Sequence, residues 1–402
     1  MNKTEIIEIG TGYTSIPAKV GAATEIVVEE LTRASMEKGL DVVIFDISDP
    51  HRSSNDLPIT EVPMPEMISG KVGYSLGVFH KMKRVWYSLS LARHLARHIR
   101  KNKSYILHFH NQYNFFFFRM LTRASRKKNV RLYYTNHTYT WSLPWDQIKS
   151  IVRKRYFMES WSMKKADLVF VLNENTVHNL NTYLNIESSR IRLIPNGVNT
   201  SVYHKLPEDD QTVAVLRDQL KIAGRRAFFH TGTVCDRKNQ LEIIRYLTPV
   251  FLTEPDLIFL YAGAIKEPEY FAAIEEYCKQ NNIEQNVRYL GELPPGKALN
   301  TYYNLAEAFL FFSKSEGFSL SMLEALSSGL PVLLSKNLEM SFIREKQNGI
   351  LLFGQQEEFL SLLKENLLCR DRLRELSGQA ACFIQKNYSW GTIVDKYFPS
   401  ES

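Results

Sequence analysis

The chain has few cysteines and no long apolar run. Its four cysteines are Cys235, Cys278, Cys369 and Cys382. They lie far apart without a Cys-x-x-Cys pair, which argues against a disulfide scaffold and a structural zinc site. No stretch approaches the roughly 18 apolar residues of a membrane-spanning helix. The first ten residues include Glu5 and Glu8 and no long apolar run, so we expect no signal peptide and a cytoplasmic setting.

Acidic residues are scarce in one part of the chain. Within 71–165, only Asp146 and Glu159 oppose 21 lysines and arginines. Residues 1–200 hold 28 basic and 17 acidic residues, whereas the remainder holds 22 and 26, within an overall charge of +7. The first half therefore has a basic face and the second half does not.

Short apolar runs alternate with helical patterns over all 402 residues, a length that suits two domains. We expect strands at 6–10, 41–47, 104–110, 130–137, 166–174 and 191–198, then at 225–232, 256–263, 286–293, 306–313 and 330–335. A proline-rich stretch, 58–65, is expected to form a loop. The pattern predicts an α/β fold of two doubly wound parallel-sheet domains, with a boundary near 199–210. Such domains would face a cleft beyond the carboxyl ends of their strands.

The segment 313–335 carries the strongest chemical signal. A predicted strand delivers the chain to Ser315, Glu316 and Gly317, and a helix is expected to start near Ser319. Its first turn would offer backbone N–H groups and the positive end of a dipole to an anion. Glu316 and Glu324 would lie about 12 Å apart along the helix, enough to reach opposite ends of a sugar nucleotide. A solvated glutamate pair on an ordinary helix fits the same spacing.

The segment 228–240 also suggests anion binding. A strand ends at His230, Gly232 allows a tight turn, and Arg237 and Lys238 follow in a loop that opens a helix. A lysine placed there can neutralise a diphosphate, although a solvated loop lysine is an equal alternative. Near the amino terminus, the glycines at 10, 12 and 21 match a dinucleotide fingerprint only weakly, because Ser15 stands where the third glycine belongs.

Three histidines stand at predicted strand ends. His108 and His110 end one strand, and His137 follows another among polar and aromatic residues. We expect His108 to be structural and His137 to be a candidate functional residue. No carboxylate or cysteine lies near the His108–His110 pair in sequence, so we expect no metal site there.

Together these segments resemble the retaining glycosyltransferases of family 4, which have the GT-B fold of two facing Rossmann-like domains. The family's paired glutamates match Glu316 and Glu324, and its phosphate-binding lysine matches Lys238 after Gly232. The other matching segments are the phrase PNGV (195–198), the glycine-rich loop at Gly21 and Ala22, the phrase QNGILL (347–352), and YSW (388–390) at the start of a terminal helix.

The resemblance implies two domains, acceptor-binding 1–200 with a returning helix at 386–402, and donor-binding 201–385. It implies metal-independent transfer of a hexose from a nucleotide-diphosphate sugar, UDP favoured and GDP the alternative, with retention, in cell-surface polysaccharide or glycoconjugate synthesis. The acceptor would be a glycan or a lipid-linked molecule, and neither a metal nor another cofactor would be required.

The resemblance also implies roles for individual residues. His137, Lys238 and Glu316 would be catalytic, with His137 near the donor sugar, Glu316 on its hydroxyls and Lys238 on the leaving diphosphate. Glu324 would bind the ribose. The further donor-binding residues would be Gly21, Ala22, Gly232, Thr233, Arg237, Gly317, Phe318, Ser319 and Leu320.

Residues 79–103 form a candidate basic amphipathic helix, with apolar anchors that include Met82, Trp86 and Leu95. One interpretation is peripheral attachment to the inner face of the cell membrane beside the acceptor site. A core-facing helix with a solvated basic side fits equally well. Nucleic acid is a weaker third partner, and we expect none, because no binding motif is present.

Two rival functions remain open. One is an epimerase or dehydrogenase that uses a nicotinamide cofactor, suggested by the α/β halves and by Asp46 at the end of a strand. The other is a sugar-nucleotide-binding subunit without turnover, since Thr233 stands where the resembled family often has arginine. NAD binding would identify the first, and nucleotide binding without release of the diphosphate would identify the second.

Overall fold

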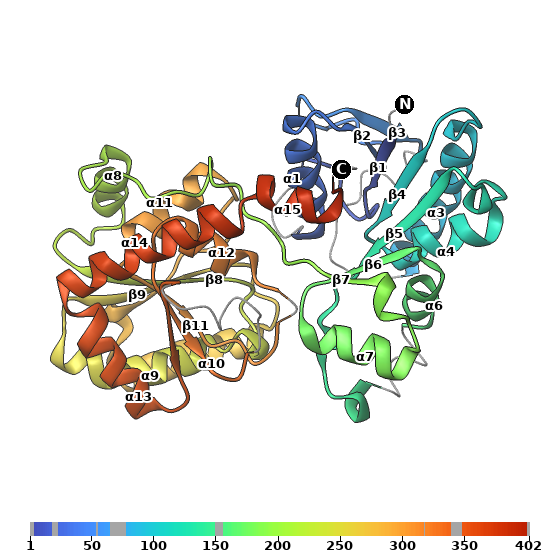
Figure 1. Ribbon diagram of the computed structural model, residues 1–402. Coiled ribbons are helices and arrows are strands. Elements are labelled where there is room, and N and C mark those ends of the chain that lie inside the picture. Colours follow the sequence, from blue (N-terminus) through green and yellow to red (C-terminus); the bar gives the residue numbers. More distant parts are fainter. Residues whose placement is uncertain are drawn as a thin grey trace. The chain divides into compact units, whose positions relative to one another are not determined.

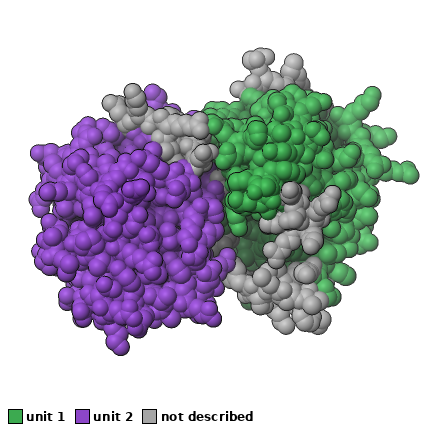
Figure 2. Space-filling view, turned by 90° about the horizontal axis from the view of Figure 1, so that it is seen from below, with its two compact units in different colours: residues 1–196, 393–402 green, residues 197–392 purple. Residues whose placement is uncertain are grey.

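The computed structural model describes residues 4–17, 23–53, 55–64, 78–148, 156–316, 318–338 and 348–399, and side chains at 78–81 are outside this description. The chain divides into two compact units, distinguished in Figure 2. Unit 1 comprises residues 1–196 and 393–402, and unit 2 comprises residues 197–392. Each unit has its own parallel sheet, which confirms the predicted α/β class.

Unit 1 contains a seven-stranded sheet in the order β3-β2-β1-β4-β5-β6-β7 (Figure 1). Its strands are β1 (Glu5–Ile9), β2 (Asp41–Ile47), β3 (Ile59–Val62), β4 (Tyr105–Phe109), β5 (Val130–Thr135), β6 (Leu168–Val171) and β7 (Ile191–Leu193). Its helices are α1 (Ala23–Glu37), α3 (Val78–His98), α4 (Gln112–Leu121), α6 (Phe157–Lys165) and α7 (Glu174–Leu184), with short 3₁₀ turns η1 (Ala124–Arg126), η2 (Tyr139–Ser142) and η3 (Ser188–Arg190).

Unit 2 contains a six-stranded sheet in the order β10-β9-β8-β11-β12-β13. Its strands are β8 (Arg226–Thr231), β9 (Leu257–Ala262), β10 (Val287–Tyr289), β11 (Ala308–Phe311), β12 (Val332–Ser335) and β13 (Ile350–Phe353). Its helical elements are α8 (Gln211–Gln219), η4 (Asp236–Lys238), α9 (Gln240–Thr253), α10 (Pro268–Gln280), η5 (Glu284–Asn286), α11 (Lys297–Leu305), α12 (Leu320–Ser327), α13 (Gln356–Leu362), the π-helical turn η7 (Leu363–Leu367) and α14 (Arg370–Asn387). Helix α15 (Trp390–Tyr397) begins in unit 2 and ends in unit 1.

Two strands were not predicted. The stretch 58–65, expected to be a loop, contains β3, which lies at the edge of the sheet and pairs with β2. Prolines on either side of an edge strand remove few hydrogen bonds, which is why the proline-rich pattern was misleading. The sixth strand of unit 2, β13, pairs with β12 in parallel register.

The two faces of the unit 1 sheet carry different side chains. Ile7 and Ile9 of β1 join Leu91 of α3 in the main core, whereas Val28 of α1 packs with Ile44 of β2 in a separate cluster. Because successive strand residues point to opposite faces, Glu8 lies on the opposite face from Ile7 and Ile9. The alternation of side chains along β1 therefore buries an acidic residue, Glu8, within unit 1.

Helix α3 ends earlier than predicted. The expected range 79–103 is helical only to His98. Lys103 instead lies just before β4, where its Nζ is 2.8 Å from Glu5 Oε2 and 2.9 Å from Asp41 Oδ2. These ion pairs join the starts of neighbouring strands, so Lys103 serves the sheet and is not part of a basic helical face.

Candidate functional site

The loops after β8 and β11 bring two cations and a carboxylate together in unit 2. Lys238 Nζ lies 2.7 Å from Glu316 Oε1, and an Arg237 guanidinium nitrogen lies 2.8 Å from the same oxygen. Arg237 also donates to the carbonyl of Ser315 at 2.8 Å. The Glu316 side chain is 9% exposed. Burial acts to raise the pKa of Glu316, but Lys238 and Arg237 outweigh it and hold that pKa below its usual value. The cluster of these three residues therefore carries a net positive charge.

Helix α12 begins directly after this cluster. Ser319 caps the helix, and its hydroxyl accepts a hydrogen bond from the Met322 amide. The amides of the first turn have no partner within a helix and, with the helix dipole, favour an anion nearby. Phe318 and Leu320, on either side of the cap, are partly buried. Gly317 lies outside the described residues. The predicted helix start at Ser319 is confirmed.

Glu324 lies one turn further along α12 and has a different environment. Its Oε2 accepts a hydrogen bond of 2.8 Å from the hydroxyl of Tyr303. Burial raises the pKa of Glu324 to about 7, although hydrogen bonds from Tyr303 and Tyr203 act in the opposite direction. Glu316 and Glu324 thus differ in charge state near neutral pH, with Glu316 ionised and Glu324 titrating.

The turn after β8 packs tightly against the turn after β9. Gly263 has a φ of 140°, and a Cβ there would lie 2.1 Å from the carbonyl oxygen of Gly232. The carbonyl of Thr233 accepts a hydrogen bond of 2.9 Å from the Gln240 side chain. A Cβ at Gly232 would lie 3.2 Å from the Lys238 side chain. Glycine at 232 therefore leaves room for the lysine to reach Glu316.

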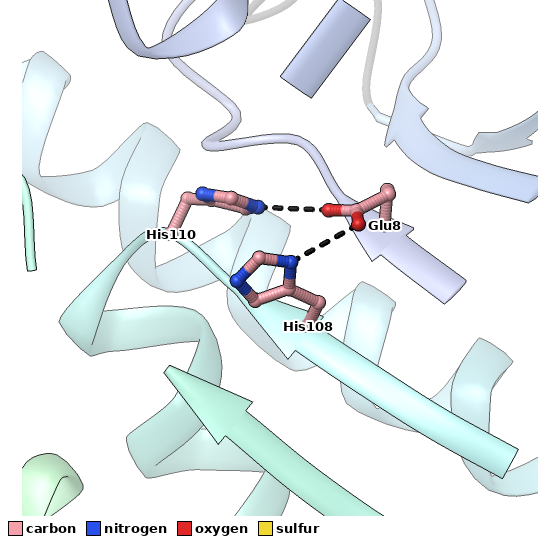
Figure 3. Close-up of side chains that lie close together, drawn as sticks. All are labelled: Glu8, His108 and His110. Atoms are coloured by element: carbon pink, nitrogen blue, oxygen red, sulfur yellow. Dashed lines mark hydrogen bonds and ion pairs between the residues drawn. The ribbon is translucent and has the colours of Figure 1, made fainter. Parts of the chain in front are cut away.

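Unit 1 contains a second polar cluster, formed by Glu8, His108 and His110 (Figure 3). Glu8 and His108 are register partners in neighbouring strands, and His110 is two residues further on. His108 Nδ1 lies 3.0 Å from Glu8 Oε1, and His110 Nε2 lies 2.8 Å from Glu8 Oε2. All three side chains have zero exposure.

The structure corrects the sequence argument that no carboxylate lies near this histidine pair. Glu8 is about 100 residues away in sequence, yet strand pairing brings it to both rings. Burial acts to raise the pKa of Glu8, but attraction and hydrogen bonds from the two imidazoles outweigh it and lower that pKa to about 2. Two features of the sequence could have pointed to this cluster. One is a glutamate inside an apolar strand, and the other is a pair of histidines separated by one residue at the end of another strand.

His137 lies beside this cluster. Its Nε2 is 2.9 Å from His110 Nδ1, and burial lowers the pKa of His137 well below its usual value. Its polar and aromatic neighbours, which suggested a functional site, have other partners. The carboxylate of Glu159 accepts hydrogen bonds from Asn136 and from the Trp141 indole, at 3.1 and 2.7 Å. Sequence reasoning missed Glu159 because the pairing depends on the tertiary fold.

The glycine-rich loop, Gly21 and Ala22, lies outside the described residues. The helix that follows it, α1, holds Glu25, which is buried and accepts a hydrogen bond from the Thr11 hydroxyl. Burial raises the pKa of Glu25.

The outer surface of α3 combines apolar and basic residues. Met82 and Trp86 are 53% and 52% exposed. Arg93 and Arg97 follow on the same side of the helix at four- and seven-residue steps. These arginines and Leu121 of α4 help to line a surface hollow of about 640 Å³. Figure 1 shows α3 and α4 close together. Within the described residues, no helix is both long and apolar enough to cross a bilayer.

Two sequence profiles match the chain, Glycosyltransferase Family 4 over residues 24–202 and Glycosyl transferases group 1 over residues 214–381. Alpha-monoglucosyldiacylglycerol synthase of Streptococcus pneumoniae is 25% identical over 168 residues, covering 41% of this chain and 37% of that protein. D-inositol 3-phosphate glycosyltransferase of Corynebacterium glutamicum is 23% identical over 248 residues, covering 60% and 58%. The chain thus spans less than two thirds of the length of these relatives.

Solved structures share the fold across nearly the whole chain. Sucrose-phosphate synthase from Thermosynechococcus elongatus has a TM-score of 0.75 at 19% identity and covers 98% of this chain and 97% of its own. Anabaena HepE in complex with UDP and glucose has a TM-score of 0.71 at 14% identity and covers 98% of both chains. At these identities the likeness shows the fold alone, which is GT-B. The two profiles together match most of the chain, so the chain belongs to the family 4 glycosyltransferases.

Proposed function

We propose that unit 2 binds a nucleotide-diphosphate sugar and that the enzyme transfers its hexose, with retention, to an acceptor hydroxyl. The observation that carries this proposal is the cluster of Arg237, Lys238 and Glu316 at the N-terminus of α12. Two cations and a helix N-terminus suit a diphosphate better than a neutral ligand. The carboxylate of Glu316 is then placed to accept hydrogen bonds from hydroxyls of the sugar.

Transfer would break the bond between the anomeric carbon and the diphosphate oxygen, and the electron pair would leave with the diphosphate. The acceptor oxygen would bond to the same carbon and pass its proton to an oxygen of the leaving diphosphate. Lys238 and Arg237 would stabilise the charge that develops on the leaving group, a role that preorganised cations fill in other enzymes. These side chains are already held by Glu316, so little reorganisation is needed. On this proposal no metal is required for transfer.

The donor is expected to be a UDP-sugar, with a GDP-sugar as the alternative. One solved structure with the same fold contains UDP and glucose, which supports UDP. The acceptor is expected to be a lipid or an inositol-type hydroxyl, because one relative is an alpha-monoglucosyldiacylglycerol synthase and another a D-inositol 3-phosphate glycosyltransferase. A place in cell-surface polysaccharide or glycoconjugate synthesis remains part of the proposal.

A lipid-linked acceptor would require access to a membrane. Trp86 and Met82 offer exposed apolar anchors on α3, and Arg93 and Arg97 continue the same side. The other half of the helix, including Leu91 and Leu95, is buried in the core. One side of α3 therefore faces the core, as one interpretation of the sequence expected, and the exposed side is left for the proposed membrane contact. We propose that the exposed side binds an anionic membrane surface.

A thermal-shift screen with UDP-, GDP- and ADP-sugars tests donor binding. A ligand at about 100 times its Kd stabilises the folded state by about 2.7 kcal/mol and raises the melting temperature. NAD serves as the comparison ligand for the dehydrogenase alternative. Stabilisation by NAD alone would contradict the proposal. The alternative result is that a nucleotide sugar stabilises the protein while no nucleoside diphosphate is released with lipid or inositol acceptors. That result would favour the subunit without turnover.

A further inference from the structure

We infer that Glu8, His108 and His110 form a binding site for a divalent transition metal ion, with zinc the best match to the donor set. One carboxylate and two imidazoles are a common ligand combination for zinc, with a fourth position for water or another ligand. The site lies in unit 1 and shares no residue with the diphosphate cluster, so it stands independently of the proposed function.

The distances suit a metal. The ligand atoms of the three residues all lie within 4.8 Å of one another. The two measured separations from Glu8 oxygens to histidine nitrogens are 3.0 and 2.8 Å. Ligands bonded at about 2.1 Å to one ion are separated by roughly 3.0–3.5 Å, depending on the coordination angle. Small side-chain adjustments would therefore let one ion contact all three residues.

The far nitrogen of each imidazole also has a partner, as is usual for histidines that bind metals. His108 Nε2 lies 2.7 Å from the hydroxyl of Thr135, and His110 Nδ1 lies 2.9 Å from His137 Nε2. The His108 ring is held further by an edge contact to Phe170, at 5.4 Å between ring centroids. Both rings are thus oriented with one nitrogen toward Glu8, and a bound ion would replace the hydrogen bonds between them.

The charge of the cluster also favours a bound metal ion. Glu8 has zero side-chain exposure, and in the described part of the chain its only ion-pair partners are the two imidazoles. No lysine or arginine of that part forms an ion pair with it. A buried carboxylate needs a positive partner. A divalent ion bound to Glu8 would supply a larger positive charge than the two imidazoles alone.

Metal binding would also set the position of a proton on His137. With an ion on His110 Nε2, the ring proton must lie on Nδ1, which donates to His137 Nε2. His137 would then carry its own proton on Nδ1. Without the ion, His110 Nε2–H donates to Glu8, and His137 Nε2–H donates to His110. In this account His110 is a positioning residue that fixes the tautomer of its neighbour.

The test measures metal content of the full chain. The protein is unfolded in chelator and refolded with zinc, dialysed against metal-free buffer and analysed by elemental mass spectrometry. Wild type is expected to retain about one zinc ion per chain. Glu8→Gln and His110→Gln are expected to lose it. His178→Asn removes a histidine outside the cluster and serves as the matched control.

Wild type that retains no zinc after refolding with the metal would overturn the site, as would a folded Glu8→Gln variant that binds it equally well. Where the variants do not fold, X-ray absorption on wild type decides. Two imidazoles and oxygen ligands at about 2.0–2.2 Å support the site, whereas a sulfur ligand near 2.3 Å contradicts it. Nitrogen NMR of the imidazoles reports the tautomer of His137, which is expected to change when zinc is removed.

Discussion

Replacing Lys238 with alanine is expected to reduce sugar transfer by about a hundredfold or more. Lys238 Nζ lies 2.7 Å from Glu316 Oε1, in the loop that we propose to hold the diphosphate. Removing one preorganised donor from developing negative charge typically costs about 2.7–4 kcal/mol of transition-state stabilisation. That cost corresponds to about a hundred- to a thousandfold in rate.

The variant is expected to remain folded. The Glu316 carboxylate keeps its contact with Arg237 at 2.8 Å, so the substitution does not leave a buried charge without a partner. Loss of one charged hydrogen bond costs about 1–3 kcal/mol, whereas the free energy of unfolding of a typical protein is roughly 5–15 kcal/mol. Thermal unfolding followed by circular dichroism checks this expectation.

The assay is release of nucleoside diphosphate from a saturating donor sugar in the presence of an acceptor. Lys336→Ala is the matched control, because Lys336 forms an exposed ion pair with Glu358 at 2.6 Å. Its turnover is expected to equal that of wild type. Turnover near the wild-type value in folded Lys238→Ala would refute the reasoning, as would an equal loss in the control.

Four further outcomes are expected. The pKa of Glu324 is raised to about 7, and we propose that its ionised form accepts hydrogen bonds from ribose hydroxyls. The affinity for nucleoside diphosphate should then rise between about pH 6 and pH 8. A calorimetric profile that stays flat in wild type, or keeps its slope in Glu324→Gln, would contradict this role. The same raised pKa means that Glu324 takes up a proton on folding, so its contribution to stability is full below pH 4.5 and is lost as pH rises through about 7. Gly263→Ala places a Cβ 2.1 Å from a carbonyl oxygen, whereas Gly224→Ala, at a φ of 74°, meets nothing within 4 Å. Gly263→Ala should lower the melting temperature more than Gly224→Ala. Equal decreases in melting temperature would show that backbone strain alone determines the loss. Finally, wild type should co-sediment with anionic vesicles at low salt and be released by salt, and replacing Arg93 and Arg97 with alanine should weaken this binding. Equal binding to neutral vesicles would count against the basic surface.

The strands were largely predictable because a buried parallel strand is nearly continuous in apolar residues. A glycine or a proline lies near one end of most of these apolar strands. The pattern failed at β3, a four-residue edge strand between prolines, and at β13, whose apolar run was read only as a matching phrase. Short edge strands bury less surface, so their signal in sequence is weaker.

The candidate site was only partly predictable. Lys238 and Glu316 could be found because each lies in the segment that follows a strand, and the carboxyl ends of parallel strands meet at one edge of a sheet. The sequence did not predict that they form an ion pair, nor that Tyr303 binds Glu324. Glu8 was missed because its approach to the histidines depends on strand register, which no local pattern specifies.

The most direct measurement is a crystal structure of the protein with UDP or GDP bound, since the central claim is that unit 2 holds the diphosphate. The account predicts that phosphate oxygens lie within hydrogen-bonding distance of Lys238 Nζ and of an amide in the first turn of α12. A diphosphate bound elsewhere, with the Lys238–Glu316 contact left as it is, would contradict it.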